Sequence, residues 1–190
     1  MEHLILYPKS IAVIGNHLPR LCGIATFTTD LCNALATELP NPENVIALAM
    51  DDKKIPETLD KRMEVIDKVF EATHAAGVPD DKVYIDPLAM TIATKNQSSV
   101  IACDTICAAH EKYPKAHFTM GLSNISFGLP VRKQVNRAFL TLAMQAGLDS
   151  AILDPLDKEL RAAIVTTEML LGKDKHCMNY LKASRAGLFE

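Results

Sequence analysis

Residues 121–130 read Gly121-Leu122-Ser123-Asn124-Ile125-Ser126-Phe127-Gly128-Leu129-Pro130, and this stretch decides how the rest of the chain is interpreted. It follows a short apolar run that ends at Met120 and precedes a strongly periodic segment that begins at Arg132. A strand that ends in small and amide-bearing residues, and then turns through glycine and proline, presents polar groups at its C-terminal edge. In parallel α/β sheets that edge is where ligands bind. We therefore interpret the stretch as a binding site as well as a connection.

The composition is that of a globular protein. Of the 190 residues, 48% are hydrophobic and 23% are charged, and the formal net charge is −3. This balance, without a cluster of Lys and Arg, gives no reason to expect a nucleic-acid partner. No apolar run approaches the roughly 20 residues that span a bilayer, and the N-terminus lacks the basic flank of a signal peptide. We expect a cytoplasmic protein with no membrane partner.

Five cysteines are scattered along the chain, at positions 22, 32, 103, 107 and 177. Cys103 and Cys107 are one helical turn apart, but no second pair completes a metal site. We interpret the cysteines as buried thiols in a reducing compartment, and the alternative is a metal or redox role.

Short apolar runs alternate with helical patterns throughout. The expected strands are residues 10–14, 44–49, 83–85, 117–120 and 150–153. The expected helices are residues 23–39, 58–76, 98–113, 132–146, 158–171 and 175–186. Such alternation predicts an α/β fold with a parallel sheet and right-handed crossovers.

Polar residues follow the expected strands with some regularity, namely Asp51 and Asp52, Asp86, Asn124 and Asp154. Carboxylates and amides just past successive parallel strands converge on one rim, which is the strongest argument from the residues for a polar ligand. The alternative for each single aspartate is that it caps a loop or a helix.

From about Asn44 to the C-terminus the chain resembles the pterin-binding methyltransferases, and most of all the methyltetrahydrofolate:corrinoid/iron–sulfur protein methyltransferases. The matching segments are residues 45–52, 84–88, 121–130 with Arg132, and 146–149 running into 154–157. The resemblance implies a partial TIM-type (β/α) barrel of the dihydropteroate synthase kind. About four βα units are present, equivalent to strands five to eight.

Residues 10–36 resemble a different family, the first strand, loop and helix of family-4-like glycosyltransferases. The matching residues are 11–15 and 19–27. We therefore expect one foreign βα unit before the half-barrel, with domains at residues 1–43 and 44–190 and a seam near Pro40 to Asn44.

The methyltransferase resemblance implies that the chain binds methyltetrahydrofolate and transfers the N5 methyl group to the cobalt of a corrinoid. The corrinoid would be carried by a partner protein. The resemblance assigns the catalytic role to Asn124, whose amide would orient and stabilise N5; the alternative is a turn residue with an unusual backbone conformation.

The resemblance also assigns substrate contacts. Asp86 would accept hydrogen bonds from the amino and ring N–H groups of the pterin, and its alternative is a turn opener before proline. Arg132 would meet the folate or its anionic tail, unless it is a solvated residue of the first helical turn. Asp51 and Asp154 are weaker candidates for substrate binding.

Two other functions stay open at this point. Four barrel strands cannot close an eight-stranded barrel, and unpaired parallel strands leave exposed edges. We therefore expect a homo-oligomer, such as a homodimer, and a non-catalytic half-barrel that self-associates is one alternative. A glycosyltransferase fragment is the other.

Overall fold

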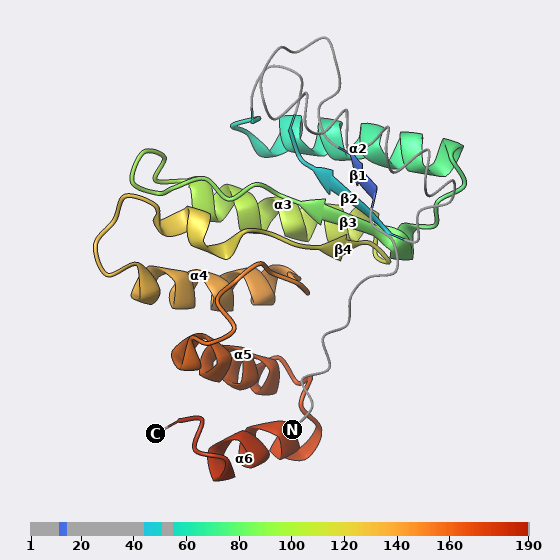
Figure 1. Ribbon diagram of the computed structural model, residues 1–190. Coiled ribbons are helices and arrows are strands. Elements are labelled where there is room, and N and C mark those ends of the chain that lie inside the picture. The colour runs from blue at the N-terminus through green and yellow to red at the C-terminus, as the bar shows by residue number, and fades with distance from the viewer. Residues whose placement is uncertain (1–11, 15–43, 51–54, 190) are drawn as a thin grey trace. The chain divides into compact units, whose positions relative to one another are not determined.

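The computed structural model of the chain describes residues 12–14, 44–50 and 55–189. The chain divides into two compact units (Figure 1). The first comprises Met1–Asp86 with Tyr113–His117, and the second comprises Pro87–Lys112 with Phe118–Glu190. Among the described residues, no helix is both long and apolar enough to cross a membrane.

The first unit is built on parallel strands. β1 (Ala12–Ile14), β2 (Val45–Leu48) and β3 (Val83–Asp86) pair side by side. The sheet order is β1-β2-β3-β4, and β4 (His117–Phe118) contributes His117 to this unit. The register places Val45 opposite Val83 and Leu48 opposite Asp86. In β2 and β3 alternate residues are buried, as the pleat of a strand requires. The predicted parallel α/β fold is confirmed for this part of the chain.

Helix α2 (Leu59–Ala75) covers the sheet of the first unit with one apolar stripe. Ile66, Val69 and Phe70 are buried on it, as the helical spacing of the sequence predicts. The helix ends where glycine follows, because Gly77 adopts a φ of +74°, which only glycine adopts readily. A short 3-10 helix, η1 (Asp80–Lys82), then leads into β3.

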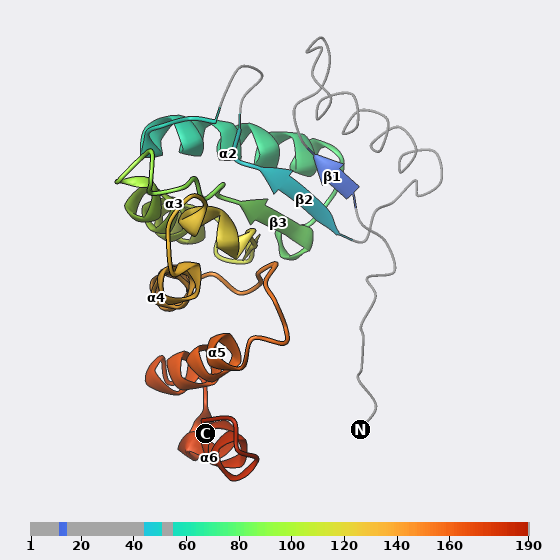
Figure 2. The same ribbon diagram turned by 60° about the vertical axis from the view of Figure 1, so that its left-hand side comes forward.

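The second unit is mainly helical. It contains α3 (Ser98–Lys112), η2 (Leu122–Ser126), α4 (Arg132–Ala146), α5 (Lys158–Leu170), η3 (Lys175–Cys177) and α6 (Met178–Arg185). Helix α4 packs against α3, α5 and η2, and α5 packs against α6. Figures 1 and 2 show α4, α5 and α6 following one another. The buried core includes Phe118, Met120, Leu122, Ile125, Phe139 and Leu140.

The end of the sheet is shorter than the sequence predicts. Strand β4 covers only His117–Phe118, and residues 150–153 form no strand but a single parallel bridge between Gly121 and Ile152. The backbone N–H of Ile152 donates to Met120 at 2.8 Å, and its carbonyl accepts from Leu122 at 3.2 Å. The predicted strand 150–153 was therefore wrong in extent, because this segment is paired on one side only among the described residues.

The cysteine prediction needs correction. Cys103 is half-buried, whereas Cys107 and Cys177 are exposed, because they lie on solvent-facing positions of α3 and at the start of α6. The structure does not describe Cys22, Cys32 or the predicted helix 23–39. Of the predicted seam at residues 40–44, it describes only residue 44.

Candidate functional site

The loop after β4 carries Asn124 on its surface. Residues 122–126 form η2, whose apolar members Leu122 and Ile125 are buried and fix the turn to the core. Asn124 itself is exposed. Its side-chain amide lies over Gly121, where an added Cβ would stand 3.2 Å from Nδ2. Burial of its neighbours therefore anchors the backbone at Asn124, and the absence of a side chain at Gly121 leaves room for the amide.

A closed set of hydrogen bonds holds the loop on the side of α4. The hydroxyl of Ser126, which is fully buried, donates to the carbonyl of Ser123 at 3.2 Å. The guanidinium of Arg132 donates to both residues, from Nε to Ser126 Oγ at 3.0 Å and from Nη2 to the Ser123 carbonyl at 2.7 Å. Asn124 lies between the two residues that are bound in this way.

The loop is also held from the segment that precedes α3. The backbone N–H of Ile92 donates to the carbonyl of Ile125 at 3.1 Å. The hydroxyl of Thr91 donates to the carbonyl of Phe127 at 2.5 Å. Asn124 is thus an exposed side chain on a backbone that is anchored on two sides.

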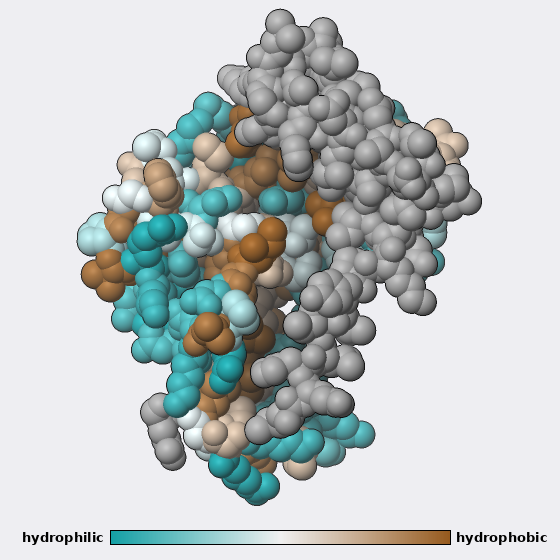
Figure 3. All heavy atoms as spheres, viewed as in Figure 1, coloured by the Kyte–Doolittle hydropathy of each residue, from teal (hydrophilic) through white to brown (hydrophobic). Residues whose placement is uncertain are grey.

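Beside this loop lies a cavity of about 350 Å³ between the start of α4 and the segment that leads into α5. It is lined by Leu122, Ser123, Arg132, Lys133, Asn136, Ile152, Leu153, Asp154, Asp157 and Leu160. On the face drawn in Figure 3, apolar residues interrupt the hydrophilic surface. Ile152 in the cavity wall is 76% exposed.

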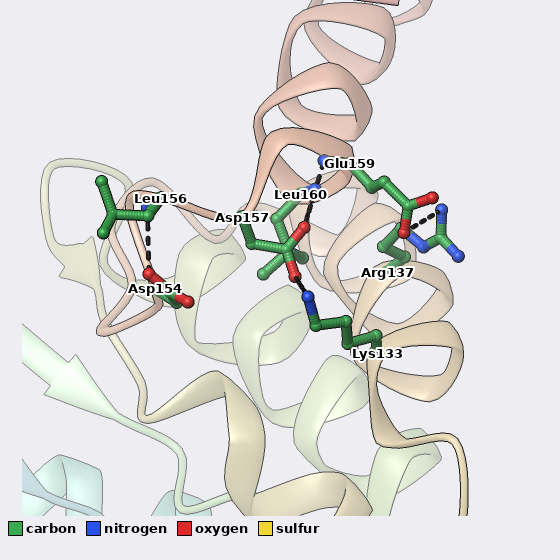
Figure 4. Close-up of polar contacts among 7 residues, drawn as sticks. All are labelled: Lys133, Arg137, Asp154, Leu156, Asp157, Glu159 and Leu160. Carbon is green, nitrogen blue, oxygen red and sulfur yellow. Dashed lines mark hydrogen bonds and ion pairs between the residues drawn. The ribbon is translucent and has the colours of Figure 1, made fainter.

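One wall of the cavity is an ordered polar cluster, shown in Figure 4. Asp157 is the N-cap of α5, and its carboxylate accepts from the backbone N–H groups of Glu159 and Leu160 at 3.1 Å each. Lys133 lies 3.4 Å from the same carboxylate. The hydrogen bond from Leu160 is the main cause that lowers the pKa of Asp157, and Lys133 adds to it against the opposing effect of burial.

Two further polar residues face this cavity. Asp154 is exposed, and its Oδ1 accepts from the backbone N–H of Leu156 at 2.9 Å, so this aspartate also forms the turn that its alternative role predicts (Figure 4). The Oδ1 atom of Asn136 is buried and has no hydrogen-bond partner among the described residues. The sequence analysis missed Asn136, because an asparagine on a periodic helix carries no distinctive signal.

Asp86 lies in the first unit, at the end of β3. The charge of Asp86 acts on the guanidinium of Arg62, which is only 2% exposed and donates from Nε to the carbonyl of Pro56 at 3.0 Å. Burial lowers the pKa of Arg62, and Asp86 opposes that effect. The sequence analysis missed Arg62, although an arginine four residues before Ile66, on the apolar stripe of α2, could have signalled it.

The structure thus brings together only some of the predicted site residues. Arg132 and Asp154 line one cavity, and Asn124 follows directly on Ser123 in its wall. Asp86 belongs to the other unit. Asp51 lies outside the described residues. No group of three or more metal-ligating side chains occurs in the described part of the chain. An exposed amide beside a cavity with both apolar and polar walls suits recognition of an organic ligand.

The chain is similar in sequence to proteins of known family. The family model of pterin-binding enzymes matches residues 43–154. The methylcorrinoid:tetrahydrofolate methyltransferase of Eubacterium limosum is 40% identical over 143 residues, which are 75% of this chain and 53% of that protein. The methionine synthases of Mycobacterium leprae and Mycobacterium tuberculosis are 39% and 37% identical over 116 residues, which are 57% of this chain and 10% of each synthase.

The matched region contains β2, α2, β3, α3, β4, η2 and α4, and with them Asp86, Asn124 and Arg132. The chain spans about half the length of the first of these relatives, at 53%, and a tenth of the others, at 10%. More than half of the chain lies within the family match, and the chain belongs to the family of pterin-binding enzymes.

Proposed function

We propose that the chain binds a reduced pterin of the tetrahydrofolate type and takes part in methyl transfer between N5 of that pterin and the cobalt of a corrinoid on a partner protein. The observation that carries the proposal is the exposed amide of Asn124, on an anchored loop inside the family-matched residues 43–154. The methyltransferase of Eubacterium limosum, named for a methylcorrinoid and tetrahydrofolate, supports this pair of substrates.

The chemistry explains why an amide is useful at this position. Transfer from methyltetrahydrofolate breaks the bond between the methyl carbon and N5, whose electron pair stays on nitrogen. Cobalt(I) supplies the two electrons of the new cobalt–carbon bond. An amine leaves poorly unless it is protonated or hydrogen-bonded as charge develops in the transition state. The Asn124 amide can donate to N5 but cannot supply a proton, so the proton comes from solvent.

The same arrangement serves both directions. Forward and reverse transfer pass through one transition state, and a group that stabilises it accelerates both. Asp86 is proposed to accept from the amino and ring N–H groups of the pterin, which present adjacent donors to one carboxylate. Asp51 and Asp154 are further candidates for substrate contacts.

A second candidate function rests on the one-sided pairing of residues 150–153. Ile152 bonds to Met120 and Leu122 and is 76% exposed, as at an open sheet edge. We propose that residues 44–190 are half of a TIM-type barrel and that two copies of the chain associate through this edge. If the associated half-barrels catalyse no reaction, the chain is a non-catalytic homo-oligomer. The glycosyltransferase-like start of the chain remains a prediction from the sequence.

The test of the proposed function is a calorimetric titration of the purified 190-residue chain with methyltetrahydrofolate and, separately, with tetrahydrofolate. We expect binding in the micromolar range, weakened about 10- to 100-fold in Asn124→Ala and in Asp86→Ala, because ligand donors and acceptors then go unpaired. Only a chain that binds would then be assayed for methyl exchange with a corrinoid protein.

Matched controls separate loss of the site from loss of the fold. Asn179→Ala and Asp81→Ala remove the same side-chain types from exposed positions outside the proposed contacts. They should bind like the parent chain. If a chain with native circular dichroism shows no binding of either pterin, the enzymatic proposal fails. The self-associating half-barrel then remains, and light scattering would show whether it forms.

A further inference from the structure

We propose that Arg132 is a positioning residue, whose guanidinium clamps loop 121–127 in the conformation that presents Asn124. The consequence for pterin binding rests on the proposed function, whereas the clamp itself concerns only the loop. Nothing in the sequence singles out this role, because the two acceptors of Arg132 are a buried hydroxyl and a backbone carbonyl.

The first argument is the geometry of the contact. Nε and Nη2 of Arg132 donate to two different residues of the loop, Ser126 at 3.0 Å and Ser123 at 2.7 Å. These acceptors are themselves joined at 3.2 Å. The three bonds close a triangle that fixes the separation of residues 123 and 126, and therefore the turn that bears Asn124. Only a planar guanidinium supplies two such donors in a fixed relation; an ammonium cannot.

The second argument is where Arg132 sits. It begins α4, and the N-terminus of a helix carries partial positive charge, which disfavours a cation there. The preceding residue, Val131, adopts a φ of 50°, a left-handed conformation that is strained for a β-branched side chain. Two unfavourable features coincide at the start of one helix. At this same position the side chain of Arg132 reaches back to the loop.

The third argument concerns the surroundings of the contact. Ser126 is completely buried, so its hydroxyl needs partners within the protein. Arg132 also lies 5.9 Å from the centroid of the Phe127 ring, which is 66% exposed. The guanidinium therefore contacts η2 at Ser123 and Ser126 and lies near the ring that follows it. An amide that acts by electrostatic orientation must be held before the ligand arrives, and this is what the clamp achieves.

The alternative role of Arg132 is direct contact with the anionic tail of folate from the wall of the adjoining cavity. The two roles differ in what they predict. A clamp matters equally for a pterin with and without a tail, and it acts on the loop when no ligand is present. A tail contact matters only for the ligand that has the tail.

The first test therefore uses no ligand. Hydrogen exchange of the Asn124 and Phe127 amides, which donate to Gly121 and Asn124 within the loop, is measured by NMR on the parent chain, Arg132→Ala, Arg132→Lys and Ser126→Ala. We expect exchange about tenfold faster or more in Arg132→Ala, partial recovery in Arg132→Lys, and little further change when Arg132→Ala is combined with Ser126→Ala. Arg161→Ala, on an exposed position of α5, is the matched control.

An internal reference makes this result decisive. Amides in the buried part of α3, such as that of Ile106, should keep their parent exchange rates in Arg132→Ala. Unchanged exchange at Asn124 and Phe127 would overturn the clamp, and so would equal acceleration of the α3 amides, since the effect would then be global.

The second test uses two ligands, tetrahydrofolate and a tetrahydropterin that lacks the aminobenzoyl-glutamate tail. Arg132→Ala is expected to weaken the binding of both ligands by the same factor, within about twofold. A loss confined to tetrahydrofolate would assign Arg132 to the tail instead and overturn the positioning role. If neither ligand binds the parent chain, the proposed function fails, while the exchange measurement still decides the clamp.

Discussion

The side-chain amide of Asn124 lies against the backbone of Gly121, so that a β-carbon at Gly121 would stand 3.2 Å from Nδ2 and 3.7 Å from Cγ of the amide. The φ of Gly121 is −75°, which any residue adopts. The glycine is therefore needed for space and not for its backbone freedom. Because the amide is the group that we assign to N5 of the pterin, this contact links a conformationally ordinary glycine to function.

The first prediction follows from that contact. Gly121→Ala should displace the Asn124 amide by a few tenths of an ångström and weaken tetrahydrofolate binding by about three- to tenfold, with little change in the melting temperature. The measurement is calorimetric titration. The control is the same substitution in an Asn124→Ala background, where it should have no further effect on affinity. Equal losses in both backgrounds would show that Gly121 acts independently of the amide.

The second prediction concerns Val131, which has a φ of 50° and is 72% exposed. Val131→Gly should raise the free energy of unfolding by about 0.5–1 kcal/mol, because relief of the left-handed strain outweighs the added flexibility of glycine. Urea denaturation measures it. Val100→Gly, within α3 at 49% exposure, is the control and should lower the free energy of unfolding by a similar amount. A fall in both variants would mean that Val131 is not strained.

Much of this architecture was predictable from the helical periodicity of apolar residues and from the glycine and proline residues that end helices. Helix α4 covers the predicted residues 132–146 without change, and α2 ends at Ala75, just before Gly77, as its glycine and proline signals indicate. Local patterns succeed here because both signals lie within a few residues. The predicted strand at residues 150–153 was wrong because strand formation depends on pairing with distant segments. The sequence of one strand does not show whether such partners exist.

The site was predictable only in part, for a similar reason. Asn124 and Asp154 follow strands predicted from the sequence, and polar residues at such positions are recognisable as candidate site residues. The contacts of Arg132 with Ser123 and Ser126, and the effect of Asp86 on Arg62, depend on side-chain direction in the folded chain. A buried arginine and a buried serine look like ordinary polar residues until their partners are known.

The third prediction concerns the reactivity of the cysteines. Burial, aided by the neighbouring Cys107 and Asp104, raises the pKa of Cys103 to about 11, so its thiolate is scarce near neutral pH. Cys107 and Cys177 are exposed. A maleimide at neutral pH should label these two quickly and Cys103 slowly, as read from peptide masses over time. Faster labelling of Cys103 than of Cys107 would contradict the half-buried position of its thiol.

The fourth prediction concerns Arg62, which is 2% exposed and acted on by the charge of Asp86. Arg62→Met should lower the free energy of unfolding by about 3 kcal/mol, because it removes the buried cation on which the half-buried Asp86 acts, together with its hydrogen bond to the Pro56 carbonyl. The double variant Arg62→Met, Asp86→Asn should recover part of that loss. Urea denaturation of the four chains completes the cycle. If the losses in the free energy of unfolding of the two single variants add up in the double variant, the two side chains do not interact.

The last prediction uses the N-cap of α5. The hydrogen bond from Leu160, with smaller effects of Lys133 and the Glu159 N–H, lowers the pKa of Asp157 below its ordinary value. A group whose pKa is lower in the folded state stabilises the fold above its unfolded value and loses that contribution as pH falls through the folded value. The melting temperature should therefore fall as pH drops from about 5 to about 3.

Asp157→Asn keeps an acceptor for the helix N–H groups but has no charge to lose. Its melting temperature should be lower than that of the parent chain at neutral pH, and the gap should narrow as the pH falls toward about 3 and below, because the parent carboxylate then takes up its proton. Asp81→Asn, on an exposed residue of η1, is the control and should follow the parent curve. A gap that stays constant across this range would mean that the charge of Asp157 contributes nothing to the cap and that its oxygen alone stabilises α5.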